Sequence, residues 1–132
     1  MISNRILQTT VEGLKAISRV DLCIVDADKN VAAKTFDNVS ECLADAISFI
    51  DSPAESQAVN GFQFFKVEDE GNLEYIIMAR GTSDDVYMVG KLAAFQIQNL
   101  LVAYKERFDK DNFIKNLLLD NLLRVDMYTR AE

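Results

Sequence analysis

The sequence of 132 residues contains no histidine. Histidine is the usual base that activates serine and cysteine nucleophiles and the commonest zinc ligand, so its absence removes the common forms of both sites. The glycine-rich patterns that hold phosphates, GxxxxGK[ST] and GxGxxG, are also missing. Groups of acidic residues all fall at expected turns or at a helix start, where carboxylates have local structural roles: Asp26/Asp28, Glu68/Asp69/Glu70 and Asp84/Asp85. We therefore expect no enzyme and no catalytic residues.

Cysteine and long apolar runs are also scarce. The two cysteines, Cys23 and Cys42, fit no metal-binding spacing, and their apolar neighbours favour free thiols that act as small buried side chains. We expect neither a metal nor a cofactor. No apolar run approaches the ~18–20 residues of a bilayer span, and the N-terminus lacks a basic region followed by an apolar one. The sequence thus predicts a cytoplasmic protein without a membrane partner.

The charge of the chain is unevenly distributed. The net charge is −7, but residues 21–85 hold fourteen acidic residues against four basic ones, whereas residues 86–132 hold six against seven. Nucleic-acid affinity comes largely from neutralising phosphates, so an acidic body repels DNA. We expect DNA contact only through a separate module that this sequence does not include.

Hydrophobic periodicity predicts an α+β fold. Helical spacing of apolar residues predicts an amphipathic helix at residues 3–18, with Ser3 or Asn4 as its cap and with Ile6 and Ile17 on its apolar side. A second helix is expected from a cap at Asn38 to residue 50, and a helical turn follows Pro53 and ends before Asn60. Two hairpins are expected from strands at 20–26, 31–36, 62–68 and 73–80.

This order of elements indicates a PAS/GAF-like, four- to five-stranded antiparallel sheet flanked by helices. The first and last helices are expected on one face, and the 38–58 helices on the other.

The last third of the sequence predicts one helix that is far longer than the core of a small domain requires. Residues 82–85 fit a capping box, and from there to Tyr128 there is no proline and only one glycine, Gly90. Opposite charges at i,i+4, such as Lys105 with Asp109, favour a continuous helix. About 45 residues of helix would be on the order of 65 Å long. We divide the chain into a sensor domain, residues 1–108, and a helical output extension, residues 109–132.

The extension carries the signature of a dimerisation helix. Ile114, Leu118, Asn121 and Val125 follow the 4,3 spacing of a coiled coil, and a polar residue such as Asn121 can fix register and strand number. A parallel homodimer is the favoured interpretation, and a helix folded back on its own domain is the alternative. No glycine, asparagine or proline ends the helix, which suggests the front part of a longer protein.

Two basic residues in the acidic body are candidates for ligand binding. Strand alternation places Arg80 on an apolar row with Met78, and Lys66 on a row with Phe64. Such cations can neutralise a carboxylate ligand, and the hydroxyls of Thr35 and Tyr75 could add hydrogen bonds from neighbouring strands. The alternative is a snorkelling cation whose stem covers the sheet while its charge stays in water.

Three stretches of the chain stand out: MISNRILQTTVEGLKAISRVDLCIVDADKNV, DSPAESQ with FQFFKV, and YMVGKLAAFQIQNLLVAYKERFDKDNFIKNLLLDNLL. They resemble the N-terminal region of bacterial sugar-diacid-utilisation regulators of the CdaR/PucR type, and the last stretch is the most specific. The resemblance covers essentially the whole chain and implies a PAS-like sugar-diacid recognition domain ahead of a DNA-binding helix-turn-helix. It supplies no ligand-binding motif, so the candidate residues rest on the sequence pattern alone.

Two hypotheses remain open. In the first, the body binds a small anionic metabolite and the long helix transmits the change to a DNA-binding module. In the second, the body is a ligand-free dimerisation scaffold whose pocket is filled by its own phenylalanine and methionine side chains.

Overall fold

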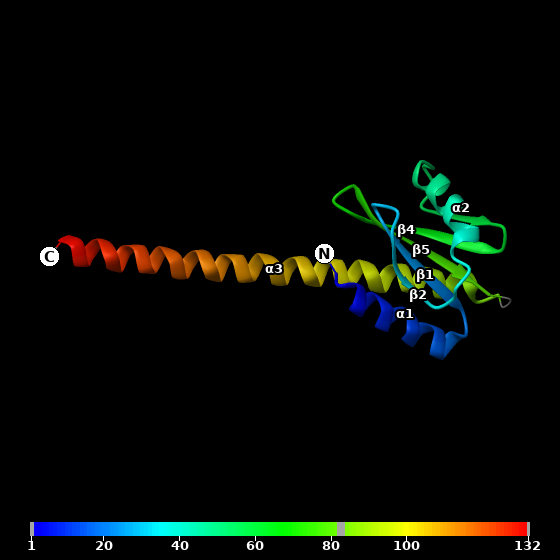
Figure 1. Cartoon of the computed structure of the whole chain (residues 1–132), viewed down its shortest axis with the longest axis horizontal. Helices are drawn as coiled ribbons and strands as arrows, with labels where there is room; N and C mark the ends of the chain where they lie inside the picture. The colour runs from blue at the N-terminus through cyan, green and yellow to red at the C-terminus, as the bar shows by residue number, and fades with distance from the viewer. Residues whose placement is uncertain (1, 82–83, 132) are drawn as a thin grey trace.

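The centre of the molecule is an open sheet of five antiparallel strands in the order β2-β1-β5-β4-β3 (Figure 1). This is a computed structural model that describes residues 2–81 and 84–131, without the side chains of residues 41, 108–113 and 115–131. The strands are β1 Asp21–Asp26, β2 Val31–Lys34, β3 Ser56–Val59, β4 Phe62–Asp69 and β5 Asn72–Arg80. The helices are α1 Asn4–Ser18, α2 Ser40–Ile50 and α3 Val86–Ala131. The predicted α+β class, with an antiparallel sheet and a long C-terminal helix, is confirmed.

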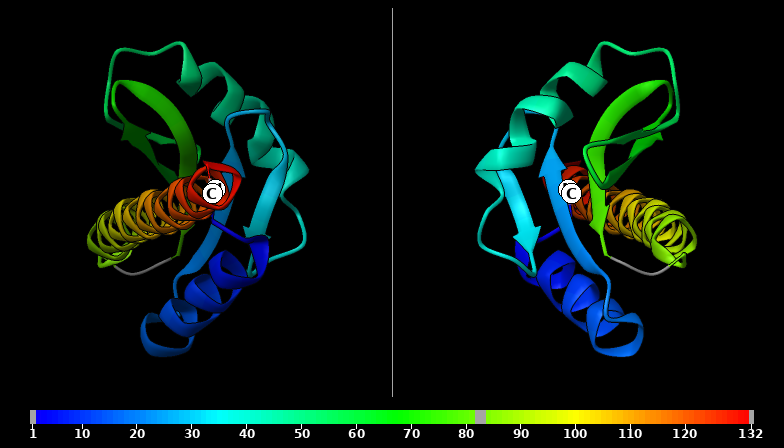
Figure 2. Two further views of the ribbon diagram at one scale, coloured as in Figure 1. Left: turned by 90° about the vertical axis from the view of Figure 1, so that its left-hand side faces the viewer. Right: turned by 90° about the vertical axis from the view of Figure 1, so that its right-hand side faces the viewer.

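Helices cover both faces of the sheet, as predicted. On one face α1 and α3 lie side by side over alternate residues of the central strands, including Leu22, Phe65 and Ile77 (Figure 2). On the other face α2 covers the intervening residues, including Phe64 and Met78. Successive strand residues point to opposite faces, so two neighbouring apolar residues on β4 or β5 belong to two separate hydrophobic cores.

The edge strand β3 replaces the helical turn that we predicted after Pro53. Its Ser56 lies opposite Phe65 and its Val59 opposite Phe62, so the loop between β3 and β4 has only two residues. These are Asn60 and Gly61, whose φ angles of 50° and 83° fit the turn that joins twisted antiparallel strands. Pairing with β4 outweighs the local helix-start signal around Pro53, and Asn-Gly was the hairpin signal in the sequence.

The helix starts agree only in part with the sequence. Ser3 caps α1, because its hydroxyl accepts a hydrogen bond from the backbone N–H of Ile6 at 3.3 Å. The cap predicted at Asn38 is wrong, because α2 begins at Ser40 after Val39, which makes no side-chain cap bond. The capping box predicted at residues 82–85 falls partly outside the described residues, and α3 begins at Val86.

The helix α3 is a single element of 46 residues, as predicted, and its distal half projects away from the sheet (Figure 1). Its buried positions, from Val86 to Leu101, contact the sheet and α1. One helical turn later Lys105 pairs with Glu70 and lies 3.9 Å from Asp69 Oδ2, so the β4–β5 turn contacts α3 where it leaves the body. The alternative of a helix folded back on its own domain is wrong. No break marks residue 108, so the domain boundary there stays a prediction.

One expectation about hydropathy needs correction. The segment Val86–Arg107 is long and apolar enough to cross a membrane by length and composition, although core helices of soluble proteins pass the same criterion. Within this segment Ala93 and Ile97 are buried against the sheet.

Candidate functional site

A polar cluster at one end of β1 joins four elements through a single carboxylate. Asp21 is the first residue of β1 and lies opposite Arg80, the last residue of β5. Its Oδ1 lies 2.7 Å from Lys15 Nζ and accepts a hydrogen bond of 3.0 Å from the Thr35 hydroxyl. Its Oδ2 lies 3.4 Å from a guanidinium nitrogen of Arg80. The cluster therefore links α1, β1, β5 and the end of β2.

The contacts of Asp21 determine its charge state. Burial by itself raises the pKa of this carboxyl, but hydrogen bonds from Lys15 and Thr35, the charge of Lys15 and the bond from Arg80 outweigh it. The net effect is a pKa below the ordinary value of 3.8, so Asp21 is a carboxylate at neutral pH.

Arg80 is held by the protein rather than left open for a ligand. Its guanidinium carbon lies 4.3 Å from the ring centroid of Phe36 and 5.8 Å from that of Phe62, in addition to its contact with Asp21. The apolar face predicted for Arg80 is confirmed, because Phe62 and Phe36 belong to the hydrophobic core between the sheet and α2. An anion could reach Arg80 only in competition with Asp21, because the pair already neutralises the guanidinium charge.

Thr35 is also part of the internal network. Its hydroxyl oxygen accepts a hydrogen bond of 2.9 Å from the backbone N–H of Leu22 while it donates to Asp21. Its carbonyl oxygen accepts one of 3.3 Å from Lys15. Arg80 and Thr35 are thus brought together as predicted, through Asp21, which the sequence did not single out.

Lys66 and Tyr75 do not join this cluster. In the β4–β5 register Lys66 lies opposite Ile76 and Arg80 opposite Phe62, so the two cations are about 13 Å apart along the strand. Lys66 instead bonds the carbonyl of Ser52, and its Nζ lies 4.9 Å from the ring centroid of Phe49.

Tyr75 lies on the opposite face of the sheet, in the core under α1 and α3, so its predicted role beside Arg80 is wrong. Burial raises the pKa of its hydroxyl, and nearby Glu74 and Asp26 add to the effect. The hydroxyl approaches the backbone of Ile2 but forms no hydrogen bond of standard geometry. Tyr75 and Ile77 are two residues apart and therefore share a face of β5, whereas Arg80, five residues from Tyr75, faces the other side. This spacing was visible in the sequence.

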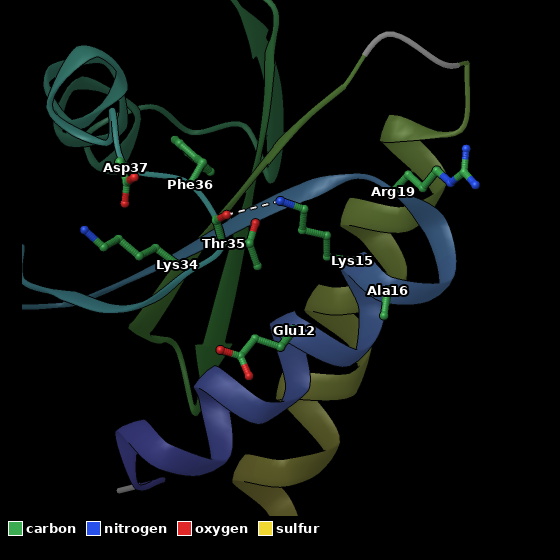
Figure 3. Close-up of a pocket in the computed structure, with 8 residues that line it drawn as sticks. All are labelled: Glu12, Lys15, Ala16, Arg19, Lys34, Thr35, Phe36 and Asp37. Atoms are coloured by element: carbon green, nitrogen blue, oxygen red, sulfur yellow. Dashed lines mark hydrogen bonds between the residues drawn. The ribbon is translucent and has the colours of Figure 1, made fainter.

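A surface pocket of about 560 Å³ opens beside the polar cluster, between α1 and the end of β2 (Figure 3). This volume is within the range of small-molecule sites. The pocket is lined by Glu12, Lys15, Ala16, Arg19, Lys34, Thr35, Phe36 and Asp37. In Figure 3, Lys15 reaches toward Thr35, whereas Arg19 points away from the other side chains. The lining has three cations and two carboxylates, a local excess of positive charge in a protein of net charge −7.

Sequence reasoning missed Lys15, Lys34 and Asp21. No local pattern reports them, because they come together only when α1 lies across the β1–β2 hairpin. A second pocket, of about 280 Å³ at the other edge of the sheet, is lined by residues that include Lys66, Lys91 and Phe95. The two candidate cations Lys66 and Arg80 therefore serve different parts of the surface.

The other predicted sites can be described only in part. Ile114 is exposed on α3, and the side chains of Leu118, Asn121 and Val125 lie outside the described residues. Cys23 and Cys42 are buried, and burial together with the nearby Cys42 raises the pKa of Cys23 to about 12. In the part of the chain that the structure describes, no three His, Cys, Asp or Glu side chains are placed to hold a metal ion.

Comparisons with protein-family models and with curated proteins found no match. The fold and the site define an α+β domain with a projecting helix.

Proposed function

We propose that this chain is a ligand-sensing, dimerising N-terminal domain of a cytoplasmic bacterial transcriptional regulator of the CdaR/PucR type. It responds to a small anionic metabolite such as a sugar diacid. The observation that carries the proposal is α3, which packs on the sheet up to Leu101 and then continues for 30 residues away from the body. Most helical stability in proteins comes from tertiary packing, so a helix that projects from its domain is expected to pack against another body. The acidic body leaves DNA binding to a module outside this sequence.

In this proposal the anion binds in the pocket beside Thr35. The ammonium groups of Lys34 and Lys15, which line the pocket, supply the positive charge. Arg80 contributes indirectly, because it shares the Asp21 carboxylate with Lys15 and so reduces the hold of Asp21 on Lys15. An anion that draws Lys15 away from Asp21 weakens the contact between α1 and the sheet. Since α1 lies beside α3 in one core, this change reaches the projecting helix.

A second candidate function is a ligand-free dimerisation scaffold. It is favoured by the core under α2, where Phe49, Phe62, Phe64 and Met78 are all buried. The Phe49 and Phe64 rings stack with centroids 5.8 Å apart, and those of Phe62 and Phe64 are 6.2 Å apart. The protein's own side chains therefore occupy the layer between α2 and the sheet.

Thermal unfolding with a broad panel of sugar acids and dicarboxylates separates the two functions. A ligand at 100 times its Kd stabilises the folded state by about 2.7 kcal/mol, which raises Tm by several degrees. We expect at least one acid to stabilise the wild type and Lys29→Ala, a charge-matched control in the β1–β2 turn. The same acid should stabilise Lys34→Ala and Arg80→Ala much less. If no acid in the panel stabilises the wild type, the scaffold is the function; equal stabilisation of all four proteins would place the ligand elsewhere.

A further inference from the structure

The body carries an apolar surface on the side of α1 and α3 that faces away from the sheet. We call it the outer face and define it by six exposed side chains: Ile6 and Ile17 on α1, and Met88, Leu92, Phe95 and Val102 on α3. Ile17 is 86% exposed and Phe95 63% exposed, although we predicted Ile6 and Ile17 on the apolar, packed side of their helix. The helix α1 therefore leaves two of its apolar residues uncovered by the sheet.

The outer face of α3 repeats with coiled-coil spacing. Met88, Leu92, Phe95 and Val102 fall at 4,3 intervals, and Asn99 occupies the remaining position of the series. The buried residues Ala93, Ile97 and Leu101 lie on the opposite side of the helix. The first five turns of α3 are thus apolar on both sides, which is typical of a helix that is covered on both sides.

The charge pattern also favours a covered surface. Between Val86 and Tyr104 the only charged residue is Lys91, whereas residues 105–111 are KERFDKD. In the single chain, only 28% of the most apolar 18-residue stretch of Val86–Arg107 is buried. Covering this stretch would therefore remove apolar groups from water without desolvating a carboxylate.

We propose that the outer face is a homodimer interface on the body, occupied by α1 and α3 of a second copy in a four-helix arrangement. A fully exposed large side chain presents roughly 200 Å², and the six side chains are 43–86% exposed, so together they present roughly 700 Å². This area is close to the ~800 Å² per partner of a stable interface. A two-fold axis places Asn99 beside its own copy, where a polar residue in the seam fixes register. The inference rests on the dimerisation in the proposed function and adds a second interface to the one predicted for residues 109–132.

The occupant of the outer face is a second copy rather than a membrane, because polar groups lie among its apolar residues. Asn99 lies within the series, and Gln96 and Gln98 flank it. Amide side chains can hydrogen-bond across a two-fold axis, but they lose hydrogen bonds in hydrocarbon.

Sedimentation equilibrium of four versions of the 132-residue chain tests the interface. We expect the wild type to be a dimer and Leu92→Glu/Phe95→Glu to have a dimer Kd at least about tenfold higher, as for central apolar residues of interfaces. The matched control is Ala44→Glu/Ser48→Glu, which adds the same charges at two exposed positions of α2, across the sheet, and should remain a dimer. The fourth protein, Leu118→Glu/Val125→Glu, tests the interface predicted for residues 109–132, which we call the arm.

The pattern of results distinguishes the two interfaces. If Leu92→Glu/Phe95→Glu remains as dimeric as the wild type while the arm variant is monomeric, the outer-face interface is overturned and the proposed arm stands. The reverse pattern supports the outer face and removes the arm. A monomeric wild type overturns the inference, and wild-type binding to phosphatidylcholine–phosphatidylglycerol vesicles that Leu92→Glu/Phe95→Glu abolishes would then assign the face to a membrane.

Cross-linking decides the case in which the double variant does not fold. Asn99→Cys should form an intermolecular disulfide under mild oxidation, because two seam positions on a two-fold axis bring their Cβ atoms within disulfide reach. Cys23 and Cys42 are buried and should not interfere. Asp28→Cys, exposed in the β1–β2 turn, is the control. No more cross-linking at residue 99 than at residue 28 would overturn the interface.

Discussion

Asp21 shows how one side chain can hold several elements together. It contacts Lys15 from α1, Thr35 from the end of β2 and Arg80 from β5. Each contact alone is a partly exposed polar interaction and contributes little to stability. Together they fix the corner of the sheet beside the largest pocket described, so any ligand in that pocket would compete for the same charges.

We predict that Asp21→Asn lowers the free energy of unfolding by about 1 kcal/mol at pH 7, because the amide keeps part of the hydrogen bonding but loses the charge. The pKa of Asp21 is lowered in the folded state, so its contribution is present above the unfolded pKa, near 3.8, and is lost as pH falls through the lower folded value. Urea unfolding of both proteins between pH 2 and 7 measures this. The difference between them should shrink below about pH 4; a constant difference would mean that charge is not the cause.

Gly90 allows α3 to approach the sheet closely. A Cβ at this position would lie 2.4 Å from Cε2 of the Phe65 ring and 3.1 Å from the Cβ of Ala79. The absence of a side chain is therefore a packing requirement at this position.

We predict that Gly90→Ala destabilises the fold by about 1–3 kcal/mol through overpacking, although alanine favours helix. Gly13→Ala is the control, because Gly13 lies in a helix and a Cβ there would meet nothing within 4 Å. It should stabilise the protein by about 0.5–1 kcal/mol. Chemical denaturation compares both with the wild type. Similar stabilisation by the two substitutions would contradict the close approach of α3 to Phe65.

At the scale of elements, Gln8 is the contact that fixes α1 on the sheet edge. Its amide nitrogen donates to the carbonyl of Lys34 at 2.7 Å, and its amide oxygen accepts from the N–H of Lys34 at 3.0 Å. The side chain thus pairs with β2 as another strand would, and it covers part of an edge that could otherwise pair with a second sheet.

We predict that Gln8→Ala exposes this edge and destabilises the protein by about 1 kcal/mol, since two hydrogen bonds are exchanged for bonds to water. Hydrogen exchange of the Lys34 amide should become faster. Thr9→Ala is the control on the same helix, because the Thr9 hydroxyl bonds only within α1, to the Arg5 carbonyl. Unchanged exchange at Lys34 would show that the Gln8 side chain does not protect this edge of the sheet.

The elements themselves were largely predictable. Both predicted hairpins follow from β-branched and apolar runs on either side of turn residues, and the Ser3 cap and the length of α3 follow from local signals. The edge strand β3 was missed because Ser56–Val59 has no alternating apolar pattern of its own, and its pairing with β4 defines it. The candidate site was predictable only for Arg80 and Thr35, because the residues that complete it, Lys15, Asp21 and Lys34, come from α1, β1 and β2.

At the scale of the whole molecule, the chain has a packed body and a projecting helix. The last α3 contact with the body is made by Lys105 among the described side chains, and the ribbon beyond it runs free (Figure 1). Most helical stability in proteins comes from tertiary packing, so we expect a helix that projects from its body to depend on a partner for stability.

We predict that a chain ending at residue 107 keeps the Tm of the body to within about 4 °C, which corresponds to less than 1 kcal/mol. Circular dichroism at 222 nm and thermal unfolding measure this against the whole chain. The helical signal of residues 108–131, taken as the difference between the two proteins, should rise with protein concentration because dimerisation stabilises the arm. A large fall in Tm would show that the arm packs on the body in solution.

The sequence by itself determined the α+β class, the two main hairpins and one long helix, because hydrophobic period, caps and turn residues act within a few positions along the chain. Tertiary structure alone decided the pairing that makes residues 56–59 an edge strand and the cluster around Asp21. It also decided which apolar side of α1 and α3 is covered. These features depend on contacts between residues far apart in sequence, which no local pattern specifies.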